Sequence, residues 1–286
     1  MTDWKGLARQ ALRGALEVRR SGQVPKEHPV CVYDLAERLG VEVRFFGGNT
    51  FGGMYAKSSD VILVPSLRPP GRQAFTAAHE LGHWRFGHGS RIDEVPEFVP
   101  DSRDDPEEWT ANLFAAYLLM PIWAVDNAFA RRGFDPSASG PAEIYTIASE
   151  LGVGYETLIK HLRFSLQKLT RERAEELLKA TPKAIRLSLI GKAETKHLLI
   201  VDRHWLNGNV DLQVGHMALL PRGTVIEGGH VAAVADLASG RLVRGLRPGV
   251  SRAFVEGCDW AKFLRVSRAD FVGRAIYRHM EDPDAS

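Results

Sequence analysis

Two histidines four residues apart, with a glutamate directly after the first, stand out in the stretch HELGH at residues 79–83. An α-helix turns by about 100° per residue, so His79 and His83 point to nearly the same side and can bind one ion. Both fall in the apolar stripe of a helix expected to begin near Arg72. A single histidine there would be typical of a packed core, whereas the pair with Glu80 predicts a metal site.

A catalytic zinc site needs a third protein ligand, because zinc usually takes three and leaves the fourth position to water. We predict that Glu108 is this ligand, since it begins a second apolar helix, and that Asn112, one turn later, orients His79. The alternative for Glu108 is a capping box with Asp105 as N-cap, and the competing ligand is Glu107. We favour Glu108 as a ligand because the histidine pair is otherwise incomplete.

His88 is the histidine nearest to the motif. A metzincin motif would place its third histidine one residue later, where the chain has Gly89. We therefore expect His88 to lie at the surface or to support a metal ligand.

These residue types indicate hydrolysis of a peptide bond. Bound zinc lowers the pKa of water toward about 7 and polarises a carbonyl, and Glu80 is placed to accept the water proton and pass it to the leaving amine. We expect Zn²⁺ as cofactor, with Mn²⁺ as the alternative metal. Tyr55, on a predicted hairpin before the histidine helix, is a candidate for stabilising the oxyanion, and the hairpin edge is a candidate for holding an extended substrate.

Composition and charge restrict the class of protein. The 286 residues are 44% hydrophobic and 25% charged, which is typical of a globular chain with room for two domains or three small ones. Lys and Arg total 37 against 35 Asp and Glu, so the overall charge does not indicate nucleic acid, membrane or an acidic partner. Cys31 and Cys258 form no CxxC motif, and the charged start of the chain differs from a signal peptide. We expect a cytoplasmic protein with no membrane contact.

Hydrophobic periodicity predicts the elements that position the site. Helices are expected near 4–20, 32–40, 72–86, 108–120, 121–129, 142–151, 155–162 and 170–183, a strand near 41–46 and a hairpin at 54–65. From Ile185 onward, short alternating runs beginning with RLSLIG predict strands, closed by a helix within 268–280. The fold class is therefore α+β. We predict a zincin-like metallopeptidase domain at 1–130, a helical helix-turn-helix-like segment and connector at 131–180, and a β-rich domain, sensory in one interpretation, at 181–286.

Two charged features leave alternatives open. The second helix of the helix-turn-helix-like segment carries only Lys160, His161 and nearby Arg163, so we favour packing or substrate docking over weak nucleic-acid contact. The C-terminal part is rich in arginine, and residues 93–108 are acidic. We favour attraction between these two segments, and the alternative is a sensor for an anion or nucleic acid.

Four stretches resemble the ImmA/IrrE family of metallopeptidases in order and spacing. They are HPVCVYDLAERLGVEV, GGMYAKSSDVILVPS, RQAFTAAHELGHWRFGH and EEWTANLFAAYLLMP, within roughly residues 1 to 130. The resemblance implies a compact zincin-like domain with zinc bound by His79, His83 and Glu108 and with Glu80 as catalytic base. Pro65 departs from the family pattern, where a polar residue is expected after the strand, and this concerns only the local loop.

The resemblance also implies a partner. Members of this family typically inactivate a helix-turn-helix repressor by site-specific cleavage, which switches on genes for stress response or mobile-element transfer. We therefore expect a zinc endopeptidase that cleaves such a repressor. The alternatives are a DNA-binding regulator with a structural metal site and a non-catalytic, antitoxin-like binding partner.

Overall fold

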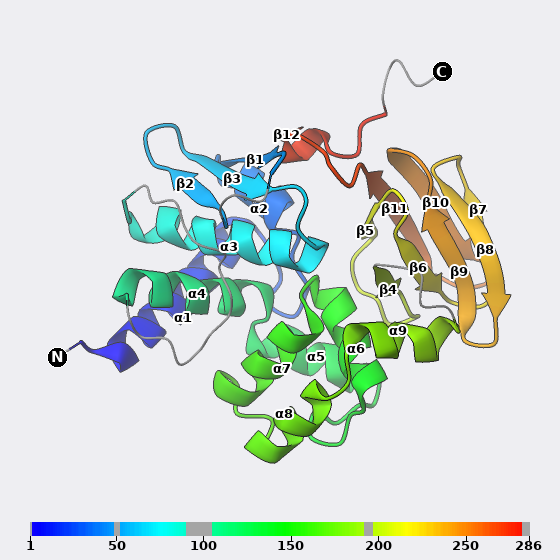
Figure 1. The fold of residues 1–286 in the computed structure, drawn as a ribbon, viewed down its shortest axis with the longest axis horizontal. Coiled ribbons are helices and arrows are strands. Elements are labelled where there is room, and N and C mark those ends of the chain that lie inside the picture. Colours follow the sequence, from blue (N-terminus) through cyan, green and yellow to red (C-terminus); the bar gives the residue numbers. More distant parts are fainter. Residues whose placement is uncertain (1, 49–51, 90–104, 192–196, 282–286) are drawn as a thin grey trace.

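The computed structural model describes residues 2–48, 52–89, 105–191 and 197–281. Most of the acidic segment predicted between residues 93 and 108 lies outside these ranges. Figure 1 shows a helical part with a small sheet beside a part built mainly of strands. The mixed α and β content predicted from the sequence is confirmed.

The part that carries the histidine motif combines one small sheet with several helices. Its elements are α1 (Trp4–Ser21), α2 (Val32–Arg38), β1 (Glu42–Phe46), β2 (Met54–Ala56), β3 (Val61–Pro65), α3 (Pro70–Phe86), α4 (Pro106–Leu119) and α5 (Ile122–Ala130). The sheet has the order β12-β1-β3-β2, where β12 (Gly273–Arg274) comes from the C-terminal end of the chain. Strands β1 and β3 are parallel, and β2 pairs antiparallel with β3 as the predicted hairpin requires.

Local sequence signals begin and end the two helices of the motif. Helix α3 has Pro70 in its first turn and ends at Gly87, whose φ of +69° is the left-handed conformation that glycine adopts without strain. Helix α4 begins at Pro106 behind Asp105, whose carboxylate accepts hydrogen bonds from the backbone N–H groups of Glu107 and Glu108. Figure 1 shows α3 between the sheet and α4.

Four more helices complete the helical part: α6 (Pro141–Leu151), α7 (Tyr155–Phe164), α8 (Arg171–Leu178) and α9 (Pro182–Ile190). The turn between α6 and α7 contains Gly152 at φ +68° and Gly154 as N-cap. Helix α7 buries Leu158, Ile159 and Leu162 in the hydrophobic core that also holds residues of α3 and α4. This pair of helices therefore packs as part of the helical core, and a DNA-binding helix-turn-helix is not established.

Two expectations for the later part of the chain are wrong. The run RLSLIG is the end of α9 instead of a strand, because Thr181 caps the helix, Pro182 begins it and Gly191 ends it at φ +67°. The helix expected within 268–280 is instead strand β12 followed by the 3-10 helix η1 (Ala275–Tyr277). Gly273, at φ +132°, and pairing with β1 favour the extended backbone there.

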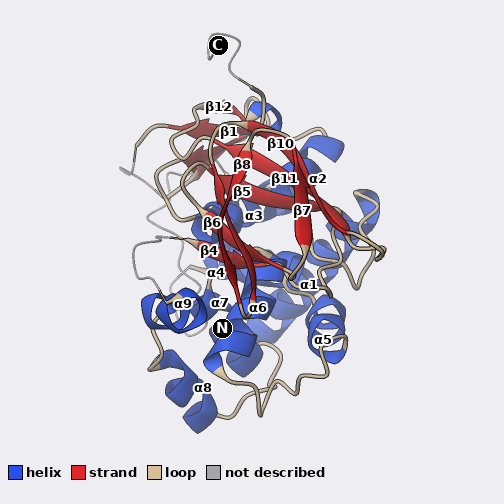
Figure 2. Ribbon diagram, turned by 90° about the vertical axis from the view of Figure 1, so that its right-hand side faces the viewer, coloured by secondary structure: helices blue, strands red, loops and turns tan. Residues whose placement is uncertain are grey.

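The remaining strands form two sheets that share one core. They are β4 (Leu198–Ile200), β5 (Asn209–Gln213), β6 (Met217–Leu220), β7 (Thr224–Glu227), β8 (Val231–Leu237), β9 (Gly240–Gly245), β10 (Gly249–Val255) and β11 (Ala261–Ser267). The sheet orders are β5-β11-β10-β7 and β4-β6-β9-β8. Residues of both sheets, including Val210, Val243 and Leu264, meet in one apolar cluster, so this part is a β-sandwich. Figure 2 shows its strands above helices α6, α8 and α9.

Buried ion pairs join the sandwich to the helices. Arg132 donates to both oxygens of Asp202 at 2.6 and 2.7 Å and to Glu150 Oε2 at 2.7 Å. Glu150 Oε1 accepts a hydrogen bond from the backbone N–H of Leu206, in the loop after β4. The side chains of Arg132 and Glu150 are 1% and 0% exposed, so each charge depends on its partner.

Replacing Arg132 by Met should lower the free energy of unfolding by about 3 kcal/mol, because Asp202 loses this cation and the buried Glu150 keeps only its pair with Arg131. Urea denaturation followed by circular dichroism measures this change. Arg171→Met is the matched control, because Arg171 pairs with Glu175 on an exposed face of α8 and its loss should change stability much less. Equal effects of the two substitutions would contradict the buried role of Arg132.

His161, on α7, should make stability depend on pH. Its ring is fully buried, its Nε2 lies 2.9 Å from the carbonyl oxygen of Met120, and burial lowers its pKa to about 4. The unfolded chain binds this proton below about pH 6.5 and the folded chain only near pH 4, so the stabilising contribution is complete above pH 6.5 and is lost as the pH falls toward 4.

The His161→Gln variant should therefore lose about 3 kcal/mol less stability than the wild type between pH 6.5 and 4. Urea midpoints across this range measure the difference. His204→Gln, at an exposed position, should follow the wild-type pH profile. A His161→Gln profile parallel to that of the wild type would contradict the prediction.

One stretch of the described residues, Pro106–Ala130, is long and apolar enough to cross a membrane. Two helices, α4 and α5, share this stretch, with Pro121 between them as the N-cap of α5. Within the structure 67% of the apolar 18-residue window in this stretch is buried, and its side chains contribute to the helical core. Its apolar character is therefore explained by packing inside this protein.

Candidate metal centre

Close packing of α3 on α4 brings the motif residues together. Gly82 lies between the two histidines of the motif, and a Cβ atom placed on it would be 3.2 Å from Ala111 Cα and 3.0 Å from a ring carbon of Phe114. A larger residue would push the helices apart, because the contact at Ala111 is backbone. Glycine at this position therefore lets α4 approach α3 closely enough for a side chain in its first turn to reach the histidines.

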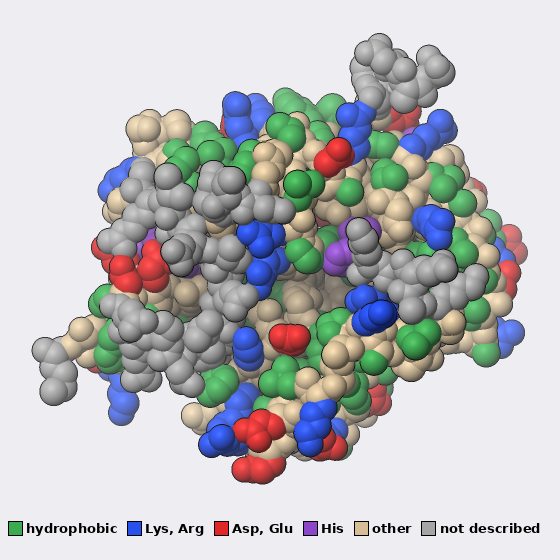
Figure 3. Space-filling model, viewed as in Figure 1, with side chains coloured by type: hydrophobic (Ala, Val, Ile, Leu, Met, Phe, Trp, Pro, Cys, Tyr) green, Lys and Arg blue, Asp and Glu red, His purple; other side chains and the backbone are tan. Residues whose placement is uncertain are grey.

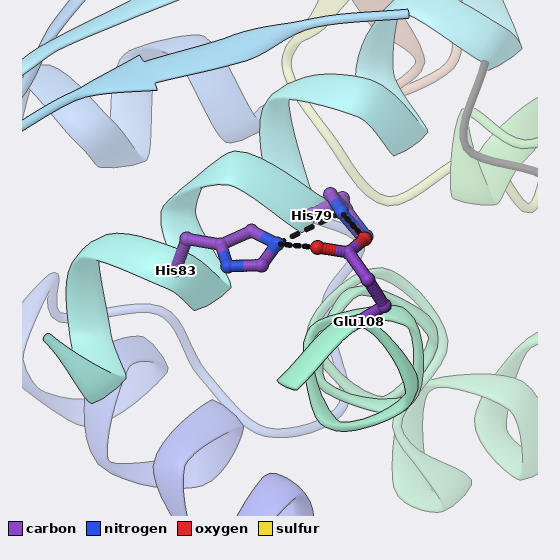
Figure 4. A group of neighbouring side chains, drawn as sticks. All are labelled: His79, His83 and Glu108. Carbon is purple, nitrogen blue, oxygen red and sulfur yellow. Dashed lines mark hydrogen bonds and ion pairs between the residues drawn. The ribbon is translucent and has the colours of Figure 1, made fainter. Parts of the chain in front are cut away.

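His79, His83 and Glu108 form a group whose ligand atoms all lie within 4.8 Å of one another. Figure 4 shows the two imidazoles on α3 and the carboxylate of α4 pointing toward one another. His79 Nε2 lies 3.2 Å from Glu108 Oε2, and His83 Nε2 lies 3.4 Å from Glu108 Oε1. The two Nε2 atoms are 3.0 Å apart. Among the described residues, this group contains Glu108 and not the alternative Glu107.

These separations fit a zinc ion. With zinc–nitrogen distances of 2.0–2.1 Å, two ligands of a tetrahedral ion are about 3.3 Å apart, close to the three distances in this group. Two imidazoles and one carboxylate are also a ligand set that catalytic zinc takes in proteins. The donor set and spacing therefore support the prediction that His79, His83 and Glu108 hold a metal ion.

Hydrogen bonds behind the ligands orient both imidazoles. His79 Nδ1 lies 3.1 Å from Asn112 Oδ1, and an amide oxygen only accepts, so Nδ1 donates and the lone pair of His79 remains on Nε2. His83 Nδ1 lies 2.9 Å from Nδ1 of His88. The structure thus places Asn112 as predicted from its spacing, and it places His88 against a histidine of the site.

Glu108 also has the position in α4 that the alternative interpretation, a capping box with Asp105 as N-cap, requires. It is in the first turn of α4, where the Asp105 carboxylate accepts from its backbone N–H. The Glu108 side chain, however, is directed at His79 and His83. Helix capping by Asp105 and an ion ligand at Glu108 are therefore compatible, because one uses the backbone and the other the carboxylate.

Glu80 is buried at 1% exposure, next to the start of strand β2. A Cβ atom on Gly53 would lie 2.7 Å from Glu80 Oε1 and 2.4 Å from Thr76 Cγ2, so the backbone of Gly53 approaches α3 directly. The structure places the predicted base beside the edge strand of the sheet. The role of Gly53 was not predicted from the sequence, where the GG pair before the predicted hairpin is the only local signal for it.

Tyr55 does not have the role expected for it. Its hydroxyl donates to Asp60 Oδ1 at 2.7 Å within the β2–β3 hairpin. Burial, together with this hydrogen bond, raises the pKa of Tyr55 to about 12. The hydroxyl is therefore used to stabilise the hairpin, and the expectation that it stabilises an oxyanion is not supported.

Removing the Asn112 amide should weaken metal binding. Asn112→Ala takes away the acceptor that fixes the tautomer of His79, and loss of such a partner typically costs 10–100-fold in metal affinity. Competition with a chromophoric chelator measures the zinc affinity. Asn127→Ala is the control, because Asn127 donates to the carbonyl oxygen of Glu27 and is not part of the group. Unchanged zinc affinity of Asn112→Ala would contradict the orienting role.

A helix with the HExxH pattern whose histidines meet a carboxylate from the following helix is the arrangement of a metallopeptidase site. Residues 36–163 match the model of the IrrE N-terminal-like domain. Residues 36–163, called the family domain below, are therefore similar to the ImmA/IrrE family of metallopeptidases, and the resemblance found in the sequence is confirmed. The matched range includes α6 and α7.

Two relatives are similar over the same length of chain. The radiation response metalloprotease IrrE of Deinococcus deserti is 32% identical over 107 residues, which cover 37% of this chain and 37% of the relative. The protein of the same name from Deinococcus radiodurans is 30% identical over 107 residues, covering 37% of this chain and 32% of the relative. The match thus spans about a third of each relative.

Proposed function

We propose that this protein is a zinc-dependent endopeptidase. The proposal depends on one observation: the ligand atoms of His79, His83 and Glu108 lie within 4.8 Å of one another. Glu80, the residue after His79, is buried. Similarity to the ImmA/IrrE family supports the same activity. The division into domains at 1–130, 131–180 and 181–286 also remains a proposal.

His79, His83 and Glu108 would hold the ion, which when bound supplies a lowered water pKa and polarises the scissile carbonyl. Glu80 would accept a proton from the attacking water as its oxygen bonds to the carbonyl carbon. As the C–N bond breaks, Glu80 would give that proton to the leaving amine. Asn112 and His88 would keep the two imidazoles oriented, since each contacts the Nδ1 side of one ligand.

Strand β2 is the element best placed to hold a substrate. It is at the end of the sheet order, so one side of its backbone has no neighbouring strand within the described sheet. An extended peptide can add to such an edge through main-chain hydrogen bonds. The approach of Gly53 to Glu80 would place that peptide beside the predicted base.

The substrate we propose is a helix-turn-helix transcriptional repressor, cleaved in the cytoplasm to release stress-response or mobile-element genes. Similarity to this family supports a protein substrate, and the two relatives are named for a radiation response. The alternative of a DNA-binding regulator is weaker, because α7 buries Leu158, Ile159 and His161 and offers few basic side chains.

Glu80→Gln tests the proposal. With a small helix-turn-helix repressor encoded beside this gene as substrate, the variant should bind zinc like the wild type and cleave 10²- to 10⁴-fold more slowly, since it lacks a base. Product formation is followed by mass spectrometry, and zinc content by atomic emission.

Glu175→Gln, on an exposed face of α8, is the control and should cleave normally. Equal cleavage by wild type and Glu80→Gln would contradict the mechanism. A stable complex with the repressor and no cleavage by the wild type would favour the non-catalytic alternative.

A further inference from the structure

A row of cations runs along the exposed side of helix α1, apart from the candidate metal centre. Its members, called the α1 row below, are Lys5, Arg9, Arg13 and Arg20, and all four are exposed. At 100° per residue they fall within about 80° of the helix circumference, and at 1.5 Å per residue the row is about 22 Å long. The row is therefore a continuous ridge of positive charge.

The acids near this ridge leave most of its charge uncompensated. Asp3, the N-cap of α1, accepts a hydrogen bond from the backbone N–H of Gly6 at 2.9 Å, and Glu17 pairs with Arg85 near the end of α3. Neither these acids nor Glu107, in the first turn of α4, forms an ion pair with the α1 row, and no other carboxylate in the described part of the chain does so. The ridge and Arg85 together carry five positive charges, against two negative charges on Asp3 and Glu17.

Helix α8 shows how cations are paired on another exposed helix of this protein. Arg171 pairs with Glu175 at i+4, and Arg173 pairs with Glu176 at i+3. Such pairs stabilise a helix. Figure 3 shows cationic and acidic side chains side by side in the lower part of the view, where α8 lies. The α1 row has no acids in the corresponding places.

The α1 row therefore lowers the stability of its helix. Four positions after Lys5 is Arg9, and four positions after Arg9 is Arg13, and like charges at this spacing repel. The first turn of α1 contains no acid, so Lys5 also stands at the positive end of the helix dipole, where only the Asp3 N-cap opposes it. A bound polyanion would offset this repulsion, whereas packing of the helix in the core does not require the row.

The rest of α1 restricts the kind of polyanion. Its apolar side lies in the helical core, through residues such as Ala11, Ala15 and Val18, so it is not available for insertion into a membrane. Trp4, the only aromatic residue of α1, packs on Trp109 with ring centroids 5.2 Å apart, so its ring serves packing and not the stacking of an unpaired base.

A protein partner is also disfavoured. Interfaces between proteins usually have an apolar patch at their centre, and α1, every residue of which is described, has no exposed large apolar side chain. The exposed side of the helix offers charge and hydrogen-bond donors. A regular array of phosphates matches this chemistry best.

A hollow beside the row gives phosphates access to three guanidinium groups. Its volume is about 420 Å³, and it lies between α1 and the end of α3. Arg9, Arg13 and Arg85 line it together with Gln10 and one acid, Glu17, which is already paired with Arg85. Guanidinium groups bind phosphate oxygens through paired hydrogen bonds.

We propose that the α1 row binds the phosphate backbone of double-stranded DNA without reading its sequence. Duplex DNA carries one negative charge per about 1.7 Å of its axis, so a ridge about 22 Å long would meet phosphates along its whole length. This contact is separate from α7, whose few basic side chains do not suit the reading of bases.

The position of the row connects it to the candidate metal centre. Helix α1 packs on α4 and α3, the two helices that supply the metal ligands (Figure 1). DNA bound there would lie on the part of the protein that carries the centre. If a transcriptional repressor is the substrate, as proposed above, this contact would keep the protein near the DNA sites of that repressor. The binding itself does not depend on that function.

Fluorescence anisotropy of a labelled duplex of about 20 base pairs and arbitrary sequence, titrated with the full chain, tests the proposal. The wild type should bind in about 50 mM salt and lose affinity steeply as the salt concentration rises. Arg9→Gln/Arg13→Gln should bind about tenfold more weakly or worse. Its slope of log affinity against log salt should be shallower by about 1.8, since each phosphate contact contributes about 0.9.

Arg171→Gln/Lys179→Gln is the matched control, because it removes the same charge from exposed positions in and directly after α8. It should keep the wild-type affinity and slope. Urea denaturation checks the fold: Arg9→Gln/Arg13→Gln should unfold at the same or a higher urea concentration than the wild type, because it removes like-charge repulsion. A lower urea midpoint would show that the row stabilises the helix and would overturn the proposal.

Three other results would overturn it as well. One is no salt-dependent binding of the duplex by the wild type at protein concentrations up to about 100 μM. Another is an equal loss of affinity in both double variants. The third is tighter binding of a different polyanion than of the duplex, measured with the single strand of the same sequence, a glutamate oligomer of matched charge and phosphatidylserine vesicles. Because only binding is measured, the result is independent of whether the protein is a peptidase.

Discussion

The close approach of α3 and α4 at Gly82 is the constraint on which the candidate centre depends. His79 and His83 are held by one helix, and they need a third ligand from another element. Only a small residue at the crossing allows the second helix near enough for Glu108 to meet them, because Ala111 and Phe114 fill the rest of the interface. The geometry of the centre is therefore a consequence of helix packing in the core.

Burial gives this arrangement its chemical character. His79, His83 and Glu80 are each at most 2% exposed, so their charge states depend on neighbours more than on water. Asn112 and His88 supply hydrogen-bonding partners on the Nδ1 sides of the ligands. The start of the edge strand β2 lies against Glu80 through Gly53, so the strand edge and the candidate base adjoin without an intervening side chain.

The junction between the family domain and the β-sandwich is polar and partly open. Two groups of ion pairs connect its two parts. One consists of Arg132, Glu150 and Asp202, and the other of Asp34, Asp211 and Arg278. Burial penalises these charges, but the Arg278 and Arg265 guanidiniums hold the pKa of the Asp211 carboxyl well below its usual range. Between these contacts lies a cavity of about 850 Å³, and α3 extends from its wall to the candidate metal centre.

The sequence by itself determined much of the local structure and the residue types of the candidate metal site. The spacing of HELGH, the caps of α4, the β2–β3 hairpin and the glycine turn before α7 all depend on neighbouring residues. It misassigned the RLSLIG run of α9 and the segment before η1, where capping and pairing with a distant strand outweigh alternating hydrophobicity. Only the tertiary structure decided that Glu108 and not Glu107 faces the histidines, that Tyr55 bonds to Asp60, and that a cavity lies at the junction. Such features arise between elements far apart in the chain, and the distance between two side chains there depends on how whole helices and sheets pack, which periodicity and spacing do not encode.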